Sequence, residues 1–120
     1  MNGRKSLGAR GEELAVEHLK AKGLRILQRG YRSPFGEADI VARDGEDVVF
    51  VEVKTRAGAS HGPAEEAVGP AKQERLGRIA QAWLEERGLA DARVRFDVVA
   101  VQDGEVRHHR DAFRAEGWTR

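Results

Sequence analysis

A chain of 120 residues and 13.3 kDa has the length of one domain, so we expect residues 1–120 to form a single domain. Cysteine is absent, which excludes disulfides, thiolate metal sites and cysteine nucleophiles. The longest apolar runs have four residues, such as Val98–Val101, far below the ~20 that a membrane span needs. The first twenty residues contain no apolar segment typical of a signal peptide, so we expect a cytoplasmic protein with no membrane partner.

The net charge of +1 is unevenly distributed along the chain. Residues 1–35 contain eight basic and three acidic residues, a charge of +5, and the rest of the chain carries −4. A basic segment suits contact with a polyanion such as nucleic acid, but lysine and arginine also keep an exposed helix soluble. Charge alone leaves both interpretations open.

The first half of the chain predicts one helix followed by three strands. The helix is expected over about residues 7–22, where Ser6 can cap it and Gly23 can end it. A weaker strand signal follows over residues 24–33. Two β-rich runs then flank the four residues 44–47 within the segment Glu37 to Arg56, and they predict a β-hairpin.

The second half predicts one helix and one strand. Residues 57–68 are rich in glycine, alanine, serine and proline and predict a long loop. Apolar residues at helical spacing predict a helix over about residues 70–87, and a strand is expected over residues 93–102. The remainder predicts a short polar tail with Phe113 and Trp118 as anchors. The element order α-β-β-β-α-β predicts a compact α/β layer fold.

Side chains alternate between the two faces of a strand, so the predicted hairpin can be divided by face. One face is apolar and must pack on helices; it comprises Ala38, Ile40, Ala42, Val49, Val51 and Val53. The other face carries the charged residues Glu37, Asp39, Arg43, Glu52 and Lys54. With a four-residue loop, Asp39 stands opposite Glu52 and Glu37 opposite Lys54. A register slip of two residues places Asp39 opposite Phe50 instead.

Like charges directly opposite each other destabilise a hairpin, so facing Asp39 and Glu52 carboxylates need an offsetting group. Solvent, an arginine, a shared proton or a metal cation would each serve. Two carboxylates at this spacing can bind one Mg²⁺ together with a phosphate substrate. Lys54 lies on the same side, where an ammonium can stabilise developing negative charge or orient water. A solvated edge hairpin with a Glu37–Lys54 ion pair has the same pattern, and that interpretation stays open.

Two residues of the predicted helices bear on the choice between a metal site and a solvated hairpin. Lys72 extends the apolar stripe of the second predicted helix, so it needs an acidic partner unless its stem reaches out to solvent. Glu12 lies at the edge of the packed face of the first predicted helix and could join the acidic pair. Taken singly, each residue also fits a surface position with a solvated charge.

The pattern of Asp39 and Glu52-Val53-Lys54 across a hairpin, behind a helix that carries Glu12, resembles the PD-(D/E)XK nuclease superfamily. Within it, the sequence resembles the YraN-like family of uncharacterised, predicted endonucleases over nearly the whole chain. The segments GEADIV at residues 36–41 and VFVEVKTR at residues 49–56 carry the resemblance. Tyr31 departs from the asparagine usual in that family, and Ala38 replaces the proline of the superfamily name.

The resemblance implies a restriction-endonuclease-like α/β core, with a mixed central sheet of four to five strands flanked by helices. It implies an endonuclease that uses Mg²⁺ or Mn²⁺ to hydrolyse phosphodiester bonds, with DNA repair or recombination intermediates as the expected substrate. The implied metal ligands are Glu12, Asp39 and Glu52, and the implied catalytic residues are Asp39, Glu52, Lys54 and Lys72. The implied nucleic-acid-binding residues are Arg4, Lys5, Arg10, Arg32 and Arg56.

Other functions fit parts of the same sequence. A nucleic-acid-binding module with a nuclease-like fold and no physiological cleavage is the main alternative, although a pure binder gains nothing from acids that face a phosphate. A transition-metal site at His61, His108 and His109 is disfavoured, because adjacent histidines in a strand point to opposite faces and a solvated tail explains them.

A homodimer is a further expectation. Cleavage of both strands of a duplex needs two metal clusters, and two-fold homodimers are the commonest oligomers. Aromatic residues are enriched at such interfaces, which makes Trp83, Phe113 and Trp118 the candidates. The position of Trp83 on the apolar stripe of its helix also fits a core residue, so the tail is the stronger candidate.

Overall fold

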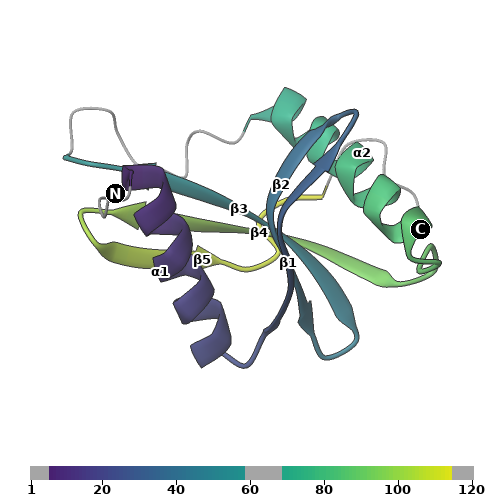
Figure 1. Ribbon diagram of the computed structural model, residues 1–120, viewed down its shortest axis with the longest axis horizontal. Helices are drawn as coiled ribbons and strands as arrows, with labels where there is room; N and C mark the ends of the chain where they lie inside the picture. The colour runs from purple at the N-terminus through teal and green to yellow at the C-terminus, as the bar shows by residue number, and fades with distance from the viewer. Residues whose placement is uncertain (1–5, 59–68, 115–120) are drawn as a thin grey trace, which may run out of the picture.

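The computed structural model describes residues 6–58 and 69–114 and contains a five-stranded sheet with one helix on each face (Figure 1). The strand order is β1-β2-β3-β4-β5; β3 and β4 are parallel and the other neighbours are antiparallel. The expected α/β class with a mixed sheet flanked by helices is therefore confirmed, and it is compatible with a nuclease-like core. The elements are α1 (Leu7–Ala21), β1 (Arg25–Ser33), β2 (Gly36–Asp44), β3 (Asp47–Arg56), α2 (Pro70–Glu86), β4 (Arg93–Gln102) and β5 (Glu105–His109).

Helix α1 begins and ends where the sequence predicts. The Ser6 hydroxyl accepts a hydrogen bond from the backbone N–H of Ala9 at 3.1 Å, and Gly23 follows the helix with a φ of 92°. Gly11 is buried where α1 crosses β3, and a Cβ at this position would collide with the Thr55 side chain. The absence of a side chain at Gly11 therefore sets how closely α1 approaches the sheet.

Two apolar clusters cover the two faces of the sheet. The cluster on the α1 side includes Ala15, Val16, Leu19, Ile40, Ala42, Val49, Val51 and Val99. The cluster on the α2 side includes Tyr31, Ala38, Val41, Phe50, Ile79, Trp83 and Phe96. Burial on both faces explains why β3 and β4 carry near-continuous apolar runs. No helix in the described part of the chain is long and apolar enough to cross a membrane.

The register of the β2–β3 hairpin is the predicted one at Arg43, which pairs with Val48, but its loop is shorter than predicted. Pairing continues to Asp44 and Asp47, so the loop has the two residues Gly45 and Glu46, and Gly45 has a φ of 61°. The four-residue loop was therefore wrong, because a two-residue turn with glycine at positive φ fits the twist of the strands.

The β2–β3 ladder ends earlier than the sequence predicts, at the pair Ile40 and Val51. Beyond this pair, β2 stays paired with β1 as far as Gly36, and Gly36 lies against Arg75 and Ile79 of α2. Strand β3 instead continues beside β4 to its end. Figure 1 shows the β1–β2 tip turning towards α2 and β3 running away from it. We call this divergence the fork. Because of it, the predicted cross-strand pairs of Asp39 with Glu52 and of Glu37 with Lys54 do not form.

The β1–β2 ribbon also reverses its faces at the fork. Arg29 contacts Glu12 of α1, whereas Tyr31, two residues later, donates a hydrogen bond to Glu86 of α2 at 2.8 Å. Gly30 lies between them with a φ of 66°. Ala38, which pairs with Tyr31, therefore lies in the α2-side cluster, and the predicted grouping of Ala38 with Ile40 was wrong.

The carboxyl-terminal segment contains a strand that the sequence does not predict. Residues 105–109 pair antiparallel with β4 as β5, so the expected polar tail was wrong at these positions. Phe113 is an anchor as predicted, since its ring stacks on Phe96 at 5.2 Å between centroids. Trp83 is a core residue with 2% of its surface exposed. Trp118 and His61 lie outside the described residues.

Candidate functional site

The Asp39 carboxylate lies at the fork, where it replaces a missing strand partner. Its Oδ2 accepts a hydrogen bond from the backbone N–H of Val53 at 2.8 Å. This N–H lies just beyond the last β2–β3 pair, so the side chain satisfies a donor that the ladder leaves open. The divergence of the strands therefore fixes Asp39 between β2 and β3.

Glu52 and two lysines lie beside Asp39 on the α2 side of the sheet. Glu52 is 5% exposed, and its Oε2 forms ion pairs with Lys54 Nζ at 3.3 Å and with Lys72 Nζ. Lys54 comes from β3 and Lys72 from the first turn of α2. Lys72, which extends the apolar stripe of α2, therefore has the acidic partner that its position in the sequence predicts. The structure thus brings together four residues that the sequence singles out: Asp39, Glu52, Lys54 and Lys72.

Burial and the neighbouring carboxylates perturb the protonation of Asp39. Burial, followed by repulsion from Glu52, raises the pKa of Asp39 to about 7, and Glu12 adds a smaller effect in the same direction. The hydrogen bond from Val53 opposes the rise because it favours the ionised form. Near neutral pH this carboxyl is thus poised between its two protonation states, a property concentrated at functional sites.

The two lysines differ in their electrostatic balance. Burial, and then the neighbouring Lys72 ammonium, lower the pKa of Lys54. Burial is also the largest single effect on the pKa of Lys72 and acts in the same direction. The hydrogen bonds with Glu52 and Lys54 and the attraction of the Glu52 and Asp39 carboxylates together outweigh burial, so the pKa of Lys72 is raised. Lys72 is therefore the firmer counter-charge of Glu52, and Lys54 is the lysine that gives up its proton more readily.

Glu12 is near this group but is held by another partner. Its Oε1 accepts hydrogen bonds from Arg29 Nε at 3.2 Å and Nη2 at 3.1 Å, and 29% of its side chain is exposed. Glu12 lies close enough to Asp39 to contribute to the rise of its pKa. Within residues 6–58 and 69–114, no three acidic or histidine side chains converge closely enough to hold a metal ion together. Glu12 as a third ligand stays a prediction.

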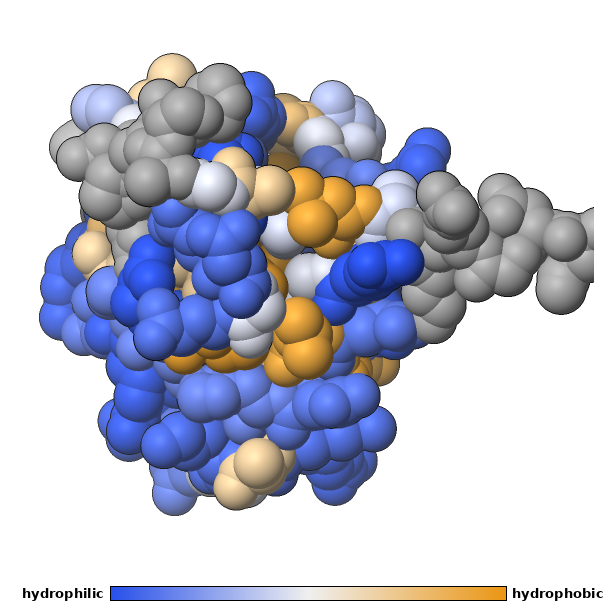
Figure 2. Space-filling view, turned by 90° about the vertical axis from the view of Figure 1, so that its left-hand side faces the viewer, coloured by the Kyte–Doolittle hydropathy of each residue, from blue (hydrophilic) through white to orange (hydrophobic). Residues whose placement is uncertain are grey.

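The predicted phosphate-binding residues are spread around the molecule. Arg10 on α1 is exposed, Arg32 at the β1–β2 tip has a side chain that is 85% exposed, and Arg56 at the end of β3 is half-buried. Figure 2 shows the side where α1 begins and β3 ends, and it is mainly hydrophilic with a few apolar residues near its middle. Arg4 and Lys5 lie outside the described residues.

Sequence reasoning missed a second polar group, which is centred on Asp97 of β4. This fully buried carboxylate accepts hydrogen bonds from Arg95 Nε at 2.9 Å, from the backbone N–H of Asp111 at 2.9 Å and from His108 Nε2 at 2.8 Å. Burial alone would raise the pKa of Asp97, but the hydrogen bonds from His108 and Arg95 hold it below its usual value. The available signal was the Arg95–Asp97 pair, two residues apart within an apolar strand, which places both charges on one buried face.

Comparison with known proteins identifies the family. The sequence profile described as "Uncharacterised protein family UPF0102" matches residues 11–101. The chain belongs to this family. A UPF0102 protein of Syntrophotalea carbinolica is 50% identical over 119 residues, which cover 96% of this chain and 97% of the relative. A UPF0102 protein of Rhodococcus jostii is 46% identical over 113 residues, covering 90% of this chain and 96% of the relative.

The family match bears on the whole fold. A UPF0102 protein of Geotalea uraniireducens is 46% identical over 114 residues, covering 91% of this chain and 90% of the relative. The matched region, residues 11–101, contains Glu12, Asp39, Glu52, Lys54 and Lys72. The predicted resemblance to the YraN-like family is confirmed at the level of this UPF0102 membership.

Proposed function

We propose that this UPF0102 protein is a metal-dependent endonuclease of the PD-(D/E)XK type, which acts in the cytoplasm on DNA repair or recombination intermediates. The observation that carries the proposal is the meeting of Asp39, Glu52, Lys54 and Lys72 at the fork. A binding protein has no use for two closely spaced carboxylates at a phosphate site, because they repel the phosphate. A phosphodiester hydrolase uses such a pair to hold a divalent cation.

The residues at the fork fit a divalent cation. Asp39 and Glu52 supply carboxylate oxygens, the ligands that Mg²⁺ and Mn²⁺ prefer, and Mg²⁺ is commonly held by one or two carboxylates plus substrate phosphate. Two ammonium groups already gather at Glu52, which shows that the position attracts positive charge. Asp39 and Glu52 would hold the ion, with Glu12 as the third carboxylate once Arg29 releases it. The bound ion would polarise the scissile phosphate and lower the pKa of a water.

The other residues have roles that follow from their positions. Lys54, the lysine with the lowered pKa, would orient the attacking water and hold its proton, while Lys72 would balance the charge of Glu52. The exposed Arg10 and Arg32, with Arg56, would bind backbone phosphates, which sets orientation without reading sequence. The substrate would therefore be recognised by its structure rather than by its bases.

One observation favours the alternative function, a nucleic-acid-binding module without cleavage. Glu52 is fully paired with Lys54 and Lys72, and Glu12 is paired with Arg29, so the charges at the fork are largely satisfied within the protein. In that function the four residues would form a structural ion-pair network. The two functions differ in one measurable property, which is whether the carboxylates bind a divalent cation.

The test combines metal binding and cleavage. Binding of Mg²⁺ or Mn²⁺ is measured by calorimetry, and cleavage is measured on single-stranded, duplex, flap and four-way-junction DNA and on RNA. We expect Asp39→Asn and Glu52→Gln to abolish both activities, whereas Glu37→Gln, an exposed carboxylate of the same strand, leaves both unchanged. An absence of metal binding at about millimolar concentration, where weak carboxylate sites bind, removes the endonuclease and leaves the binding module.

A homodimer would give the enzyme two metal clusters. Of the three candidate interface aromatics, Trp83 is buried and Phe113 stacks on Phe96 within the same chain, which leaves Trp118. Sedimentation with and without junction DNA tests the assembly. A monomer under both conditions removes the two-strand mechanism and leaves either an enzyme that nicks one strand or a binding module.

A further inference from the structure

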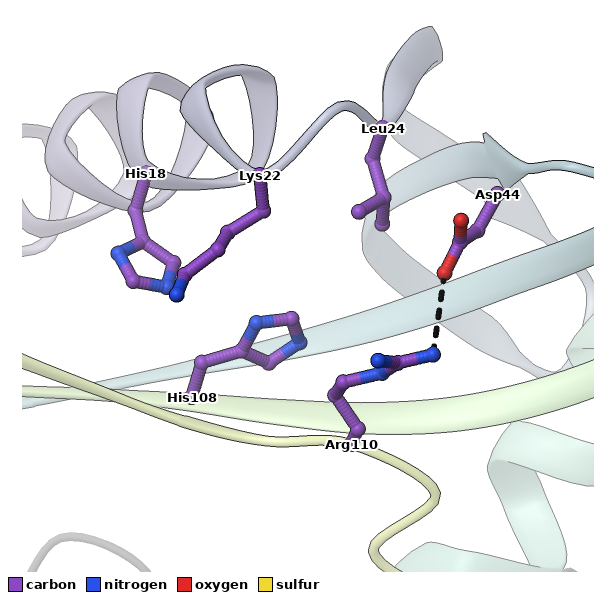
Figure 3. A pocket seen from close by; sticks show the side chains of 6 residues that line it. All are labelled: His18, Lys22, Leu24, Asp44, His108 and Arg110. Carbon is purple, nitrogen blue, oxygen red and sulfur yellow. Dashed lines mark hydrogen bonds and ion pairs between the residues drawn. The ribbon is translucent and has the colours of Figure 1, made fainter.

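A pocket separate from the fork lies between the carboxyl-terminal half of α1 and the end of β5. It is lined by His18, Lys22, Leu24, Asp44, His108 and Arg110 and has a volume of about 360 Å³. Figure 3 shows His18 and Lys22 reaching from α1 towards His108 and Arg110 on the opposite side. This volume lies within the ~300–1,000 Å³ range of small-molecule sites.

The acids around the pocket already have partners. Asp44 pairs with Arg95 at 2.8 Å and with Arg110 at 3.4 Å, and Asp97 behind the pocket pairs with Arg95 and His108. Within the described residues no carboxylate forms an ion pair with Lys22. The unbalanced charge at the pocket is therefore positive.

His18 provides the second observation. Its Nε2 is buried and has no hydrogen-bond partner among the described residues, the single such side-chain atom there. The His18 ring stands edge-on to the His108 ring, with 5.4 Å between centroids, and the His108 ring is fixed by its hydrogen bond to Asp97. A buried polar atom without a partner is costly, and a bound ligand is one way in which proteins satisfy such an atom.

We propose that this pocket binds a phosphate group, which His18, Lys22 and Arg110 hold between α1 and the end of β5. The Lys22 ammonium and the Arg110 guanidinium supply charged donors from two sides, and both side chains are common phosphate ligands. The N–H of His18 Nε2 donates to a third oxygen. Leu24 forms an apolar wall for the organic part attached to the phosphate.

The electrostatics of His18 agree with an anion at this position. Burial, and then the neighbouring His108 ring and Lys22 ammonium, lower the pKa of His18. The groups that face it are Lys22 on its own helix, Asp44 from β2 and His108 and Arg110 from the end of the chain. A phosphate dianion between these groups would raise the pKa of His18, because it stabilises the imidazolium.

The pocket is independent of the proposed metal site. It lies on the α1 face, between the end of β2 at Asp44 and the end of β5 near His108, whereas Glu52, Lys54 and Lys72 lie on the opposite, α2 face of the sheet. Asp44 and Asp39 are five residues apart in β2, about 17 Å along an extended strand. Phosphate binding can therefore be measured without a divalent cation and without cleavage.

The test uses the full chain with a chelator present. Inorganic phosphate and adenosine 5′-monophosphate are titrated at constant ionic strength, and the imidazole NMR signals are followed. We expect saturable shifts for His18 and His108, a raised pKa of His18 in the complex, and no shift for His109, which lies outside the pocket. Adenosine without phosphate should cause no shift.

Two surface variants make the test specific. Lys22→Ala should weaken phosphate binding about tenfold, as loss of a charge-assisted hydrogen bond does. Lys20→Ala, an exposed lysine of the same helix outside the pocket, should leave binding unchanged. Equal affinities for the two variants, or the same shifts when chloride replaces phosphate at the same ionic strength, overturn the proposal.

The source of the phosphate is identified with oligonucleotides that carry a 5′-phosphate or a 5′-hydroxyl. If both bind and depend on Lys22, the pocket takes a backbone phosphate. If the phosphorylated oligonucleotide alone binds, the pocket takes a terminal phosphate. If neither binds but adenosine 5′-monophosphate does, the pocket takes a free nucleotide. Each result supports the phosphate site, and a failure of DNA cleavage leaves all three unaffected.

Discussion

The substitution Asp39→Asn separates two effects of Asp39: the repulsion of its negative charge by Glu52 and the hydrogen bond that its side chain accepts from Val53. Asparagine has the size of aspartate and keeps a carbonyl oxygen that can accept the hydrogen bond from Val53 N–H. It cannot ionise, so it removes the repulsion between Asp39 and Glu52 that contributes to the raised pKa. We therefore expect the metal-free variant to be more stable than the wild-type protein above neutral pH.

The magnitude follows from the pKa of Asp39. A shift of one pKa unit corresponds to about 1.4 kcal/mol of free energy. The rise of the Asp39 pKa from 3.8 to about 7 therefore lowers the free energy of unfolding by at most roughly 4 kcal/mol. Because Asp39 titrates together with its neighbours and is partly solvated, we expect a gain of about 1–3 kcal/mol at pH 8. Between about pH 4 and 7 the folded protein retains a proton that the unfolded chain releases, so this group lowers stability as the pH rises through that window.

Urea unfolding with a chelator at pH 5 and pH 8 measures the effect. At pH 5 the Asp39 carboxyl is protonated in the folded protein but largely ionised in the unfolded chain, so roughly a third of the full difference between the wild-type protein and Asp39→Asn should be present. At pH 8 the variant should unfold at higher urea with the same slope. Glu37→Gln, which changes an exposed carboxylate, is the control. A variant that is less stable than wild type at pH 8, or a difference that is equal at both pH values, refutes the reasoning.

Three further predictions concern single contacts. Lys54→Ala should keep metal binding by calorimetry but lower the cleavage rate by about 10²-fold or more, as loss of a transition-state contact does. Gly11→Ala should lower the free energy of unfolding by about 1–3 kcal/mol through collision with Thr55, and Thr55→Ala in the same chain should restore part of it; no recovery would contradict the contact. Arg95→Met should cost about 3–5 kcal/mol because it leaves Asp97 buried without its main counter-charge, and a change below about 1 kcal/mol would show that His108 suffices.

Much of the fold follows from short-range patterns in the sequence. The apolar stripe and its Ser6 cap define α1, and the run of β-branched residues defines β4, whose observed bounds are the predicted ones. Strand β5 was missed because its sequence, Glu105–His109, is polar and lies at the edge of the sheet. The Asp103-Gly104 turn between β4 and β5 was the local signal for this hairpin, and the strand is further fixed by the hydrogen bond between His108 and Asp97.

The candidate site was predictable in its residues but not in its geometry. The strand period placed Glu52 and Lys54 on one face, and the helix period placed Lys72 on the stripe that meets them. The fork was not predictable, because strand alternation assumes that pairing continues along the whole hairpin. Gly30, with its positive φ, was the local signal for the change of face.

The pocket between α1 and the end of β5 was not predicted from the sequence, for a different reason. His18 and Lys22 look like ordinary residues on the outer part of a helix, and His108 looks like part of a polar tail. Their proximity depends on β5, which brings residues 108–110 under the carboxyl-terminal half of α1. A sequence pattern that omits this strand cannot bring the two groups together.

The hydrogen bond between Asp39 and Val53 has an evolutionary consequence. Because the carboxylate completes the backbone pairing of β3, substitution by a small apolar residue leaves a half-buried N–H without a partner. Lys54 has no comparable duty to the backbone, so its replacement leaves the strand pairing intact. A lineage that lost the proposed activity would therefore accumulate substitutions at Lys54 first and would keep aspartate or asparagine at position 39 for the sake of the sheet.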